Sequence, residues 1–428
     1  MRLQATPHNL ASEFALAIYG KVLDAVRSDV LVHQALERVG DALFIQGRHI
    51  DLTHFDRVWI AGSGKASVEM AKAAAEVVGD RLAGGIIVTK TGQAEPIPCV
   101  TVLEGSHPVP DKLSLEAGRR LLEFAESLSE KDLVIFLLSG GSSALIEATR
   151  ESISLEDLRR TNQVLLGAGV DITVMNAVRS RLSRIKAGGL ALAFEPATVI
   201  ALVLSDVVGN DLQTIGSGPL IIPTEPVGPT PGWLFEQFPP PVRALLEVSI
   251  RRRVFSPPVE HIVIGGISLA IHAAVEAARG LGLEAFPYAD PLKGEARIMA
   301  GKICSTLKKR PMEHGCMIFG GETTVTIKGN GLGGRCQEMA LAAAKAIAGV
   351  PGSCFLAGGT DGFDGPTDAA GGLVDPGSIE RAKAAGFLRN KSLAANDAYH
   401  FLEASGGLIF TGPTGSNVND LVLVVQAE

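Results

Sequence analysis

Two uninterrupted apolar runs constrain the fold of this chain more than any other feature. Leu133–Leu138 reads LVIFLL and Thr198–Leu204 reads TVIALVL, and neither run alternates between apolar and polar residues. A strand that is apolar on both sides has both of its faces buried, which is typical of a parallel sheet covered by helices. Amphipathic helical patterns, such as that of Leu10, Phe14, Ile18 and Val22, alternate with runs of this kind. The sequence therefore predicts an α/β architecture.

The length and the proline distribution predict two domains. A chain of 428 residues is too long for one ordinary domain. Ten of the 23 prolines lie between Pro219 and Pro258, and proline interrupts regular sheet and helix because it fixes φ and lacks an N–H donor. We therefore predict an N-terminal α/β domain over residues 1–240 and a second α/β domain over residues 255–428.

Composition and charge exclude several functional classes. The net charge of −7 argues against a nucleic-acid partner. No apolar run approaches the roughly 18 residues needed to cross a bilayer, and the N-terminus lacks the apolar core of a signal peptide. The five cysteines lack CxxC spacing, which argues against a disulfide framework and a zinc site. We expect a soluble, cytoplasmic protein with a small-molecule substrate.

The stretch Gly358–Asp375, GGTDGFDGPTDAAGGLVD, contains four aspartates and six glycines and follows a predicted strand. Such a loop can coordinate a cation and let the backbone approach a ligand closely. Its spacing does not fit a calcium loop, so Mg²⁺ shared with a phosphate is the better hypothesis. Asp361 and Asp364 are the candidate metal ligands, with Asp361 also the first candidate for the residue that orients the substrate hydroxyl, ahead of Asp364 and Asp206. An ordinary Asx- and glycine-rich turn is the alternative.

Four polar or glycine-rich turns connect predicted strands to helices: Gly62–Lys65, Ser139–Ser143, Ser205–Asp211 and Gly329–Arg335. In parallel α/β sheets, ligands collect at the carboxyl ends of strands, where helix N-termini favour anions. The first turn is not a P-loop, and the second lacks the GxSxG pattern of a hydrolase. Lys65, at a helix N-terminus, would be neutralised best by an anion, although a solvated lysine remains the alternative.

The turn Gly329–Gly334 matches GxGxxG, with a predicted strand at Thr323–Lys328 before it and a helix after it. Arg335 follows these glycines directly and is suited to bidentate contact with phosphate. A salt bridge to Glu338 is the alternative for Arg335. The basic residues Arg179, Arg181, Arg184 and Lys186 are expected to be mostly solvated, with one or two of them facing an anion.

Glycine-rich turns with basic residues, together with an Asp-rich loop, predict a phosphoryl-transfer site, because that chemistry depends on positioning and charge neutralisation. The candidate catalytic residues are Lys65, Arg335 and Asp361. The candidate nucleotide-binding residues are Gly62, Ser63, Gly64, Ser139, Gly140, Gly141, Ser142, Asp206, Glu322, Gly333 and Gly334.

Several of these motifs resemble those of the class II glycerate kinases. GGETTVTIKGNGLGGRCQEMAL, GTDGFDGPTDAAGGLVD and TGPTGSNVNDL resemble the C-terminal half of that family, the MOFRL type of domain, and GSGKAS, EGSHPVPD, SGGSSAL and SDVVGNDLQTIGSGP resemble the N-terminal half. The resemblance implies ATP- and Mg²⁺-dependent phosphorylation of D-glycerate, usually at the 2-hydroxyl. It also implies a Rossmann-like α/β/α sandwich with a mainly parallel sheet, a second α/β domain, and an active site in the cleft between them. The family's important lysine and arginine fall on Lys65 and Arg335.

The chain departs from the family pattern at Cys336, where asparagine is expected, at Asn210, where a second aspartate is expected, and around Ala187, where IKAGG replaces IKGG. An NAD(P)-dependent hydroxypyruvate reductase is the alternative function, supported only by Gly329–Gly334. Phosphorylation of the 3-hydroxyl and a non-catalytic nucleotide sensor also remain open, as does a homodimer.

Overall fold

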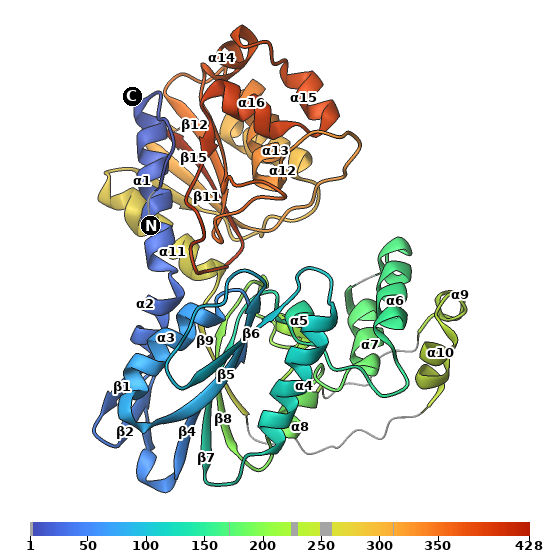
Figure 1. Cartoon of the computed structure of the whole chain (residues 1–428). Helices are drawn as coiled ribbons and strands as arrows, with labels where there is room; N and C mark the ends of the chain where they lie inside the picture. The colour runs from blue at the N-terminus through green and yellow to red at the C-terminus, as the bar shows by residue number, and fades with distance from the viewer. Residues whose placement is uncertain (1–2, 171, 224–229, 249–258, 311) are drawn as a thin grey trace. The chain divides into compact units, whose positions relative to one another are not determined.

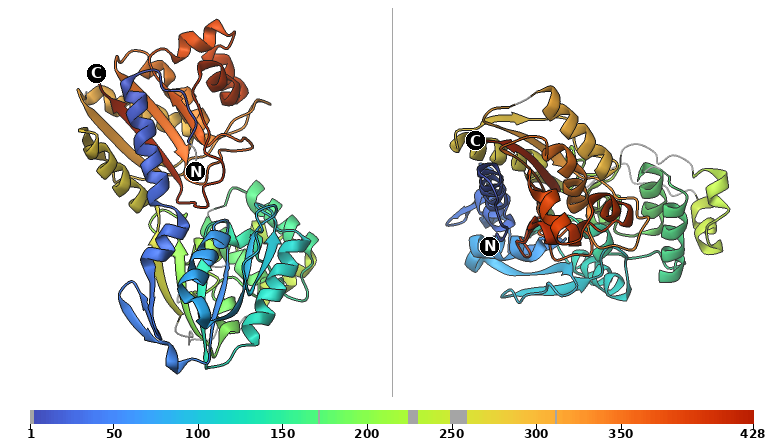
Figure 2. Two further views of the ribbon diagram at one scale, coloured as in Figure 1. Left: turned by 60° about the vertical axis from the view of Figure 1, so that its left-hand side comes forward. Right: turned by 90° about the horizontal axis from the view of Figure 1, so that it is seen from above.

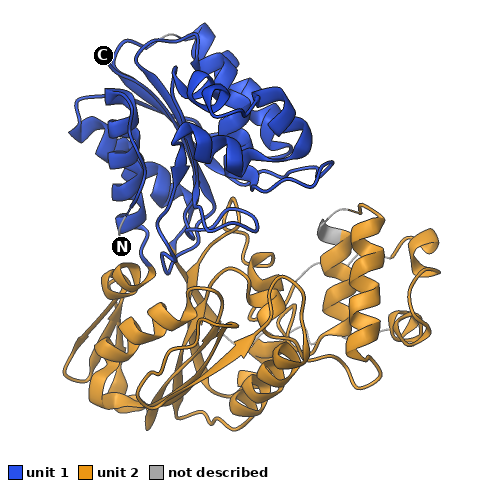
Figure 3. Cartoon of the chain, turned by 45° about the horizontal axis from the view of Figure 1, so that its top comes forward, with its two compact units in different colours: residues 1–27, 265–428 blue, residues 28–264 orange. Residues whose placement is uncertain are grey.

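A computed structural model of the chain describes residues 3–170, 172–223, 230–248, 259–310 and 312–428. The chain divides into two compact units, coloured separately in Figure 3. One unit comprises residues 28–264, and the other comprises residues 1–27 together with residues 265–428. No helix within the described ranges is long and apolar enough to cross a membrane.

The unit of residues 28–264 is built on a six-stranded sheet in the order β6-β5-β4-β7-β8-β9 (Figure 1). In that order the strands are Val100–Gly105, Leu82–Lys90, Arg57–Ser63, Asp132–Leu138, Thr198–Leu204 and Val259–Gly265. The pairings from β6 through β8 are all parallel. Every residue of β7 is buried, and only Thr198 of β8 is exposed. The predicted parallel sheet with two covered faces is confirmed.

Helices cover both faces of this sheet, because successive side chains of a strand point to opposite sides. Ala61 and Phe136 belong to the core beneath α4, Lys112–Glu126, and α8, Gly189–Phe194. The Phe136 ring meets Phe194 of α8 edge to face at 5.8 Å. α3, Ser67–Val78, packs against β4, β5 and β7.

Smaller elements complete this unit. A three-stranded antiparallel sheet contains β1, β2 and β3, and four helices with a core of their own are α6, α7, α9 and α10. The remaining bounds are α2 Ser28–Ala35, β1 Leu36–Val39, β2 Ala42–Ile45, β3 Arg48–Asp51, α5 Ser142–Leu145, α6 Leu155–Gly167, α7 Ile172–Leu182, α9 Gly232–Phe235 and α10 Pro240–Glu247.

The second unit has a mixed six-stranded sheet in the order β10-β11-β15-β12-β13-β14. In that order the strands are Glu284–Pro287, Gly315–Gly321, Asp420–Gln426, Ser353–Gly359, Gly371–Val374 and Leu408–Ile409. β10 and β11 are parallel, whereas the closing strand β15 is inserted antiparallel between β11 and β12. The register places Asp420 opposite both Gly321 and Gly359, so three distant parts of the sequence meet at one edge.

Helices again cover both faces of the second sheet. α12, Ala296–Lys309, α13, Arg335–Ile347, and α16, Ala398–Ser405, share one core with Phe355 and Val424. α1, Leu10–Ala25, packs on β12 and β15 beside α11, Ile267–Gly280, as Figure 2 shows. α14, Ser378–Ala384, and α15, Arg389–Ala395, complete the unit.

α1 shows how the local sequence prepares this packing. Asn9 caps the helix, because its side chain accepts from Ser12 N at 2.8 Å while the Ser12 hydroxyl accepts from Asn9 N at 3.0 Å. The buried face contains Ile18, Tyr19 and Val22, but Leu10 is 39% exposed, so the apolar stripe is rotated from the predicted one. The small Ala11 and Ala15 let the helix approach the strands closely.

The observed units differ from the predicted domains of residues 1–240 and 255–428 in two places. Residues 1–27 pack with the second unit, because the apolar face of α1 is buried on β12 and β15. β9, which was expected to open the second domain, is instead the sixth strand of the first sheet. Within the predicted boundary region 219–258, residues 224–229 and 249–258 lie outside the described residues. The strand expected at Thr323–Lys328 does not form, since only Thr324 makes an isolated bridge, to Glu295.

Candidate active site

Two predicted glycine-rich turns meet at the centre of the first sheet. β4 and β7 are neighbours, and the strand order reverses between them, which is where open α/β sheets bind ligands. Gly62 and Ser63 end β4, and Ser139 follows β7 directly. The backbone joins the two turns, since Ser139 N donates to Ser63 O at 3.1 Å and Lys65 N donates to Gly140 O at 2.9 Å. The structure therefore brings together all eight candidate residues of these two turns.

Glycine is required where these turns cross. Gly64 has φ +139°, and a Cβ there would lie 2.0 Å from Ser139 Oγ. Gly141 has φ +86°, and its added Cβ would lie 3.2 Å from Lys65 Cγ and 3.1 Å from His107 Cδ2. The Lys65 side chain therefore passes over Gly141 beside the His107 ring. His107, which lies in the EGSHPVPD motif, is a neighbour of the site that was not among the candidate residues.

Serine hydroxyls line the same turns. Ser63 and Ser142 are buried and hydrogen-bonded to each other. Ser139 Oγ accepts from Ala66 N at 3.1 Å, at the start of α3. Ser143 is bonded at 2.8 Å to Ser217, which lies in the turn that follows β8. Asp206 lies two residues beyond the end of β8, at the same edge of the sheet.

A buried ion pair between Lys186 and Glu147 lies next to the residues that contact these turns. Lys186 donates to Glu147, and the two residues are only 5% and 1% exposed. Glu147 also accepts from the Ser183 hydroxyl at 2.6 Å, and Ala187 N donates to Ser217 O at 3.0 Å. The expectation that Lys186 is solvated or faces an anion is therefore wrong, because its charge is neutralised inside the protein. No sequence pattern separates Lys186 from the exposed Arg184 nearby.

Arg335, the first residue of α13, is held by two carboxylates. Its Nε and Nη2 donate to the two oxygens of Asp420 at 2.6 and 2.9 Å, and its Nη1 lies 2.8 Å from Glu322 Oε1. Burial alone would lower the pKa of Arg335, but the hydrogen bonds and the charge of Asp420 raise it. The alternative salt bridge to Glu338 is not formed, because Glu338 pairs with Arg297 at 2.7 Å.

The two carboxylates that hold Arg335 differ in exposure. The Asp420 side chain is 5% exposed and the Glu322 side chain is 49% exposed. Asp420 is fixed in the sheet by β15, whereas Glu322 follows the end of β11 and is further contacted by Asn419 Nδ2 at 3.3 Å. Asp420 was not among the candidate residues, although it lies in the TGPTGSNVNDL motif.

Asp361 and Asp364 lie in the same loop but have different environments. Asp361 Oδ1 accepts from Phe363 N at 3.2 Å, as in an Asx turn. The Cβ that Gly359 lacks would lie 3.3 Å from Asp361 Oδ1 and 3.5 Å from Asp420 Oδ1, so these oxygens converge beside Gly359. The buried Tyr19 hydroxyl donates to Gly359 O at 2.6 Å and supports this turn.

Asp364 caps α13. Its two oxygens accept from Cys336 N at 3.1 Å and Gln337 N at 2.8 Å, which are otherwise unpaired donors at a helix start. Burial raises the pKa of Asp364 to about 7, although the backbone bond from Gln337 lowers it. A Cβ at Gly334 would lie 2.3 Å from Asp364 Cγ, so glycine is required there to admit the carboxylate.

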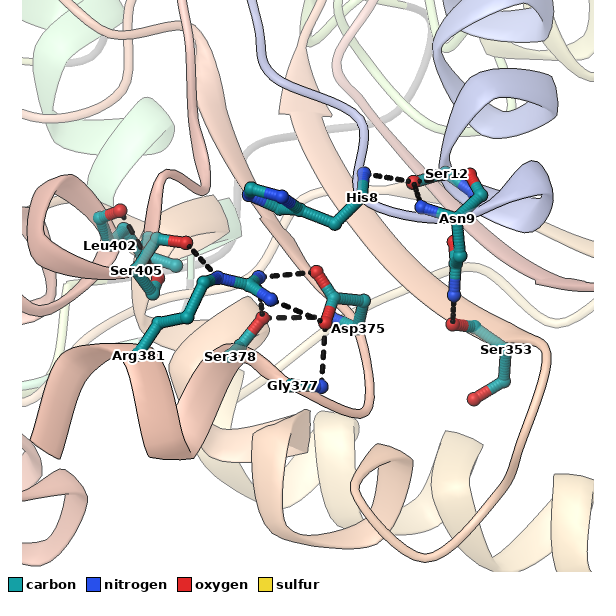
Figure 4. Close-up of polar contacts among 10 residues, drawn as sticks. All are labelled: His8, Asn9, Ser12, Ser353, Asp375, Gly377, Ser378, Arg381, Leu402 and Ser405. Atoms are coloured by element: carbon teal, nitrogen blue, oxygen red, sulfur yellow. Dashed lines mark hydrogen bonds and ion pairs between the residues drawn. The ribbon is translucent and has the colours of Figure 1, made fainter. Parts of the chain in front are cut away.

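Asp375, the last acidic residue of the Asp-rich stretch, is also a structural residue (Figure 4). It accepts from Gly377 N at 2.7 Å and pairs with Arg381, whose Nε in turn donates to Ser405 O at 2.8 Å. Within the same stretch, Gly371–Val374 forms β13. Asp361 differs from Asp375 in that one of its oxygens lies beside Gly359 together with an oxygen of Asp420.

The glycines of the GxGxxG match do not form an open cradle. A Cβ at Gly329 would lie 2.3 Å from Ala395 O, and one at Gly331 would lie 2.4 Å from Asp397 Cβ. Gly331 N donates to Ala395 O at 2.8 Å. These two glycines therefore accommodate the residues 395–397, whereas Gly333 and Gly334 lead into α13. With no strand before it, the match lacks the structural context of a dinucleotide site.

The carboxylates at this edge suit a hard cation. Mg²⁺ typically uses one or two protein carboxylates together with waters and substrate phosphates. Asp361 and Asp420 converge beside Gly359, and Glu322 lies on the other side of Arg335. In the described part of the chain, no group of three or more His, Cys, Asp or Glu side chains is arranged to hold a metal by itself. The donor set therefore fits an ion shared with a phosphate.

The chain is similar to known proteins over almost its whole length. Residues 14–228 match the model of a domain of unknown function, DUF4147, and residues 315–420 match the MOFRL family. The D-glycerate 2-kinase of Thermotoga maritima is 39% identical over 96% of this chain and 97% of its own length. A protein of Agrobacterium vitis named putative hydroxypyruvate reductase is 37% identical over 92% of this chain and 94% of its own length.

The fold is also that of a solved kinase. The crystal structure of glycerate kinase from Thermotoga maritima matches 97% of this chain and 99% of its own chain, with a TM-score of 0.83 and 38% identity. Both halves of the chain and its whole length thus match one group of proteins. The chain therefore belongs to the class II glycerate kinase family.

Proposed function

We propose that this protein transfers the γ-phosphoryl group of ATP to D-glycerate and forms 2-phospho-D-glycerate. The observation that carries the proposal is the meeting of Arg335, Glu322, Asp361 and Asp420 at one edge of the second sheet. Phosphoryl transfer requires a cation that neutralises the transferring group and an acidic group that orients the attacking hydroxyl. The names of the kinase relatives support glycerate as the acceptor.

Arg335 is proposed to contact the transferring phosphoryl group. Its guanidinium has five N–H donors in a fixed fork, and Asp420 accepts from only two of its nitrogens, Nε and Nη2. Glu322 occupies Nη1 from a half-exposed position, so it is the partner that an incoming phosphate can replace. Asp420 would stay in place, because it is buried and bonded at two points.

Asp361 is proposed to orient the acceptor hydroxyl or to hold Mg²⁺, with Asp206 as a second candidate in the other unit. When bound, Mg²⁺ would neutralise charge on the nucleotide phosphates. Asp364 is a weaker candidate for a metal ligand, because both of its oxygens accept from the start of α13. Gly333 and Gly334 keep side chains away from this helix start.

Lys65 and the turns Gly62–Gly64 and Ser139–Ser142 are proposed to hold an anionic group of a substrate. The start of α3 presents backbone N–H groups and a partial positive charge at this point. Lys65 adds a full positive charge beside Gly141. The phosphates of ATP and the carboxylate of glycerate are both anions of the required kind.

The first test is a coupled assay of the wild-type protein with ATP, Mg²⁺ and D-glycerate. Enolase accepts 2-phosphoglycerate, so we expect the product to be consumed by enolase without phosphoglycerate mutase. A signal that depends on added mutase would mean that the 3-hydroxyl is the acceptor. Oxidation of NADH with hydroxypyruvate, in the absence of ATP turnover, would instead support the reductase.

Replacement of Lys65 by alanine should lower kcat by about 10²-fold, the effect of losing one electrostatic stabiliser. The exposed Lys131 is a matched control on the same unit, and Lys131→Ala should leave kcat unchanged. Thermal unfolding of both variants should match the wild type. Wild-type turnover in Lys65→Ala would contradict the proposed contact with an anion.

Glu322→Gln should lower the KM for the anionic ligand of Arg335 by up to about fivefold. The half-exposed carboxylate of Glu322 competes with that ligand for Arg335, and the substitution removes its charge. Arg335→Lys should lose activity, since a lysine keeps the charge but not the planar fork. Steady-state kinetics with Glu313→Gln as the control would measure both effects. A collapse of kcat in Glu322→Gln at unchanged melting temperature would show that Glu322 acts directly in the reaction.

Asp361→Asn and Asp364→Asn should separate catalysis from folding. We expect Asp361→Asn to abolish turnover at an unchanged melting temperature. Asp364→Asn should cost about 1 kcal/mol of helix capping, which corresponds to a melting temperature roughly 2–4 °C lower for a unit of this size. Calorimetry and the coupled assay on both variants provide the measurements. If Asp361→Asn stays active, Asp361 does not orient the acceptor hydroxyl or hold Mg²⁺, and Asp206 becomes the candidate for that role.

A further inference from the structure

A pocket of about 440 Å³ opens beside β10 in the second unit. Its walls come from the segment after β10, from α12 and from β11. This volume is in the range of small-ligand pockets. None of its lining residues was among the sequence candidates.

The inner wall of the pocket is aromatic and apolar. The rings of Tyr288 and Phe319 are stacked 4.3 Å apart with an angle of 14° between their planes. Phe319 is buried, at 6% exposure, and Tyr288 is partly exposed. Met299 and Ile303 of α12 add a polarisable and an apolar surface. Such a wall suits a flat ring system better than it suits glycerate, which carries only polar groups.

The charged residues of the pocket are exposed. Lys293 and Lys302 line it together with Asp290, so the lining charge is positive by one unit. The structure records no ion pair for these three residues within the ranges that it describes. Lysine ammonium groups without a protein counter-ion attract phosphate. The pocket therefore combines an aromatic wall with cations, which is the chemistry of a nucleotide site.

The pocket wall is joined to the residues around Arg335 by the backbone. Leu292 N donates to Gly320 O at 2.9 Å, and Glu322 N donates to Leu292 O at 3.0 Å. A Cβ at Gly321 would lie 2.5 Å from Leu292 O, so glycine is required for this close approach. Leu292 lines the pocket, and the side chain of Glu322 reaches Arg335. The pocket and the carboxyl end of β11 are thus parts of one local structure.

We propose that this pocket binds the adenine nucleotide that donates the phosphoryl group, with the base against the Tyr288–Phe319 stack and a phosphate near Lys293 and Lys302. The proposal rests on the proposed function, in which ATP is the donor. The proposal adds a binding site for the adenine base of ATP, which the glycine-rich turns do not identify.

The test is calorimetric titration of the wild-type protein with ADP and, separately, with inorganic pyrophosphate. Lys293→Glu and Lys302→Glu should each raise the Kd of ADP by about tenfold or more, the effect of losing a charge-assisted contact. Lys309→Glu, on the same helix but outside the pocket, should leave the Kd unchanged. Tyr288→Ala should weaken ADP binding but not pyrophosphate binding, because only ADP has a base.

Unchanged ADP affinity in both lysine variants, at wild-type melting temperature, would overturn the proposal, as would the absence of ADP binding by the wild type. The lysines are exposed, so these variants remain informative even where Tyr288→Ala destabilises the core. If ADP binding depends on the pocket but glycerate is not phosphorylated, the proposed function is refuted, while the proposal that the pocket binds a nucleotide stands. Glycerate phosphorylation with an unaltered KM for ATP in both lysine variants would refute the pocket alone.

Discussion

The two-point contact between Arg335 and Asp420 is the interaction on which the candidate site depends. It joins the first residue of α13 to the first residue of β15, and β15 separates β11 from β12. The carboxyl ends of those two strands carry Glu322 and the Asp-rich loop. Leaving either partner buried without the other would be costly, because an unpaired buried charge is strongly destabilising. The same contact orients the Arg335 fork and leaves Nη1 toward the more exposed Glu322.

The balance of charge around Arg335 has a chemical meaning. Burial raises the pKa of the Tyr19 hydroxyl, and the charges of Asp361, Asp420 and Asp364 near it raise that pKa further. The single positive charge of Arg335 is outnumbered by the carboxylates around it, so without a cation this site would bind an anion poorly. A divalent cation that arrives with the nucleotide would correct that balance. The geometry thus favours a site that is completed by its substrate.

Much of the first unit could be predicted because its signals are local. Continuous apolar runs predicted β7 and β8 as buried parallel strands, and the turns Gly62–Lys65 and Ser139–Ser143 were correctly placed at the carboxyl ends of β4 and β7. The second unit was harder, because β15 is inserted between strands that precede it by many residues. Asp420 therefore could not be paired with Arg335 from spacing. Asp364 was predicted as a metal ligand, but aspartate is equally suited to cap a helix start, and only the tertiary contacts reveal that its oxygens accept from the start of α13.

The place of α1 has a consequence for the order in which the chain folds. Tyr19 of α1 bonds to Gly359, 340 positions later, so residues 28–264 form an insertion within the other unit. During synthesis the inserted unit is complete while the partners of α1 have not yet left the ribosome, and domains generally fold as units in the order of their synthesis. The first helix made must therefore wait for β12 and β15. Its exposed apolar face during that interval is a natural target for chaperones.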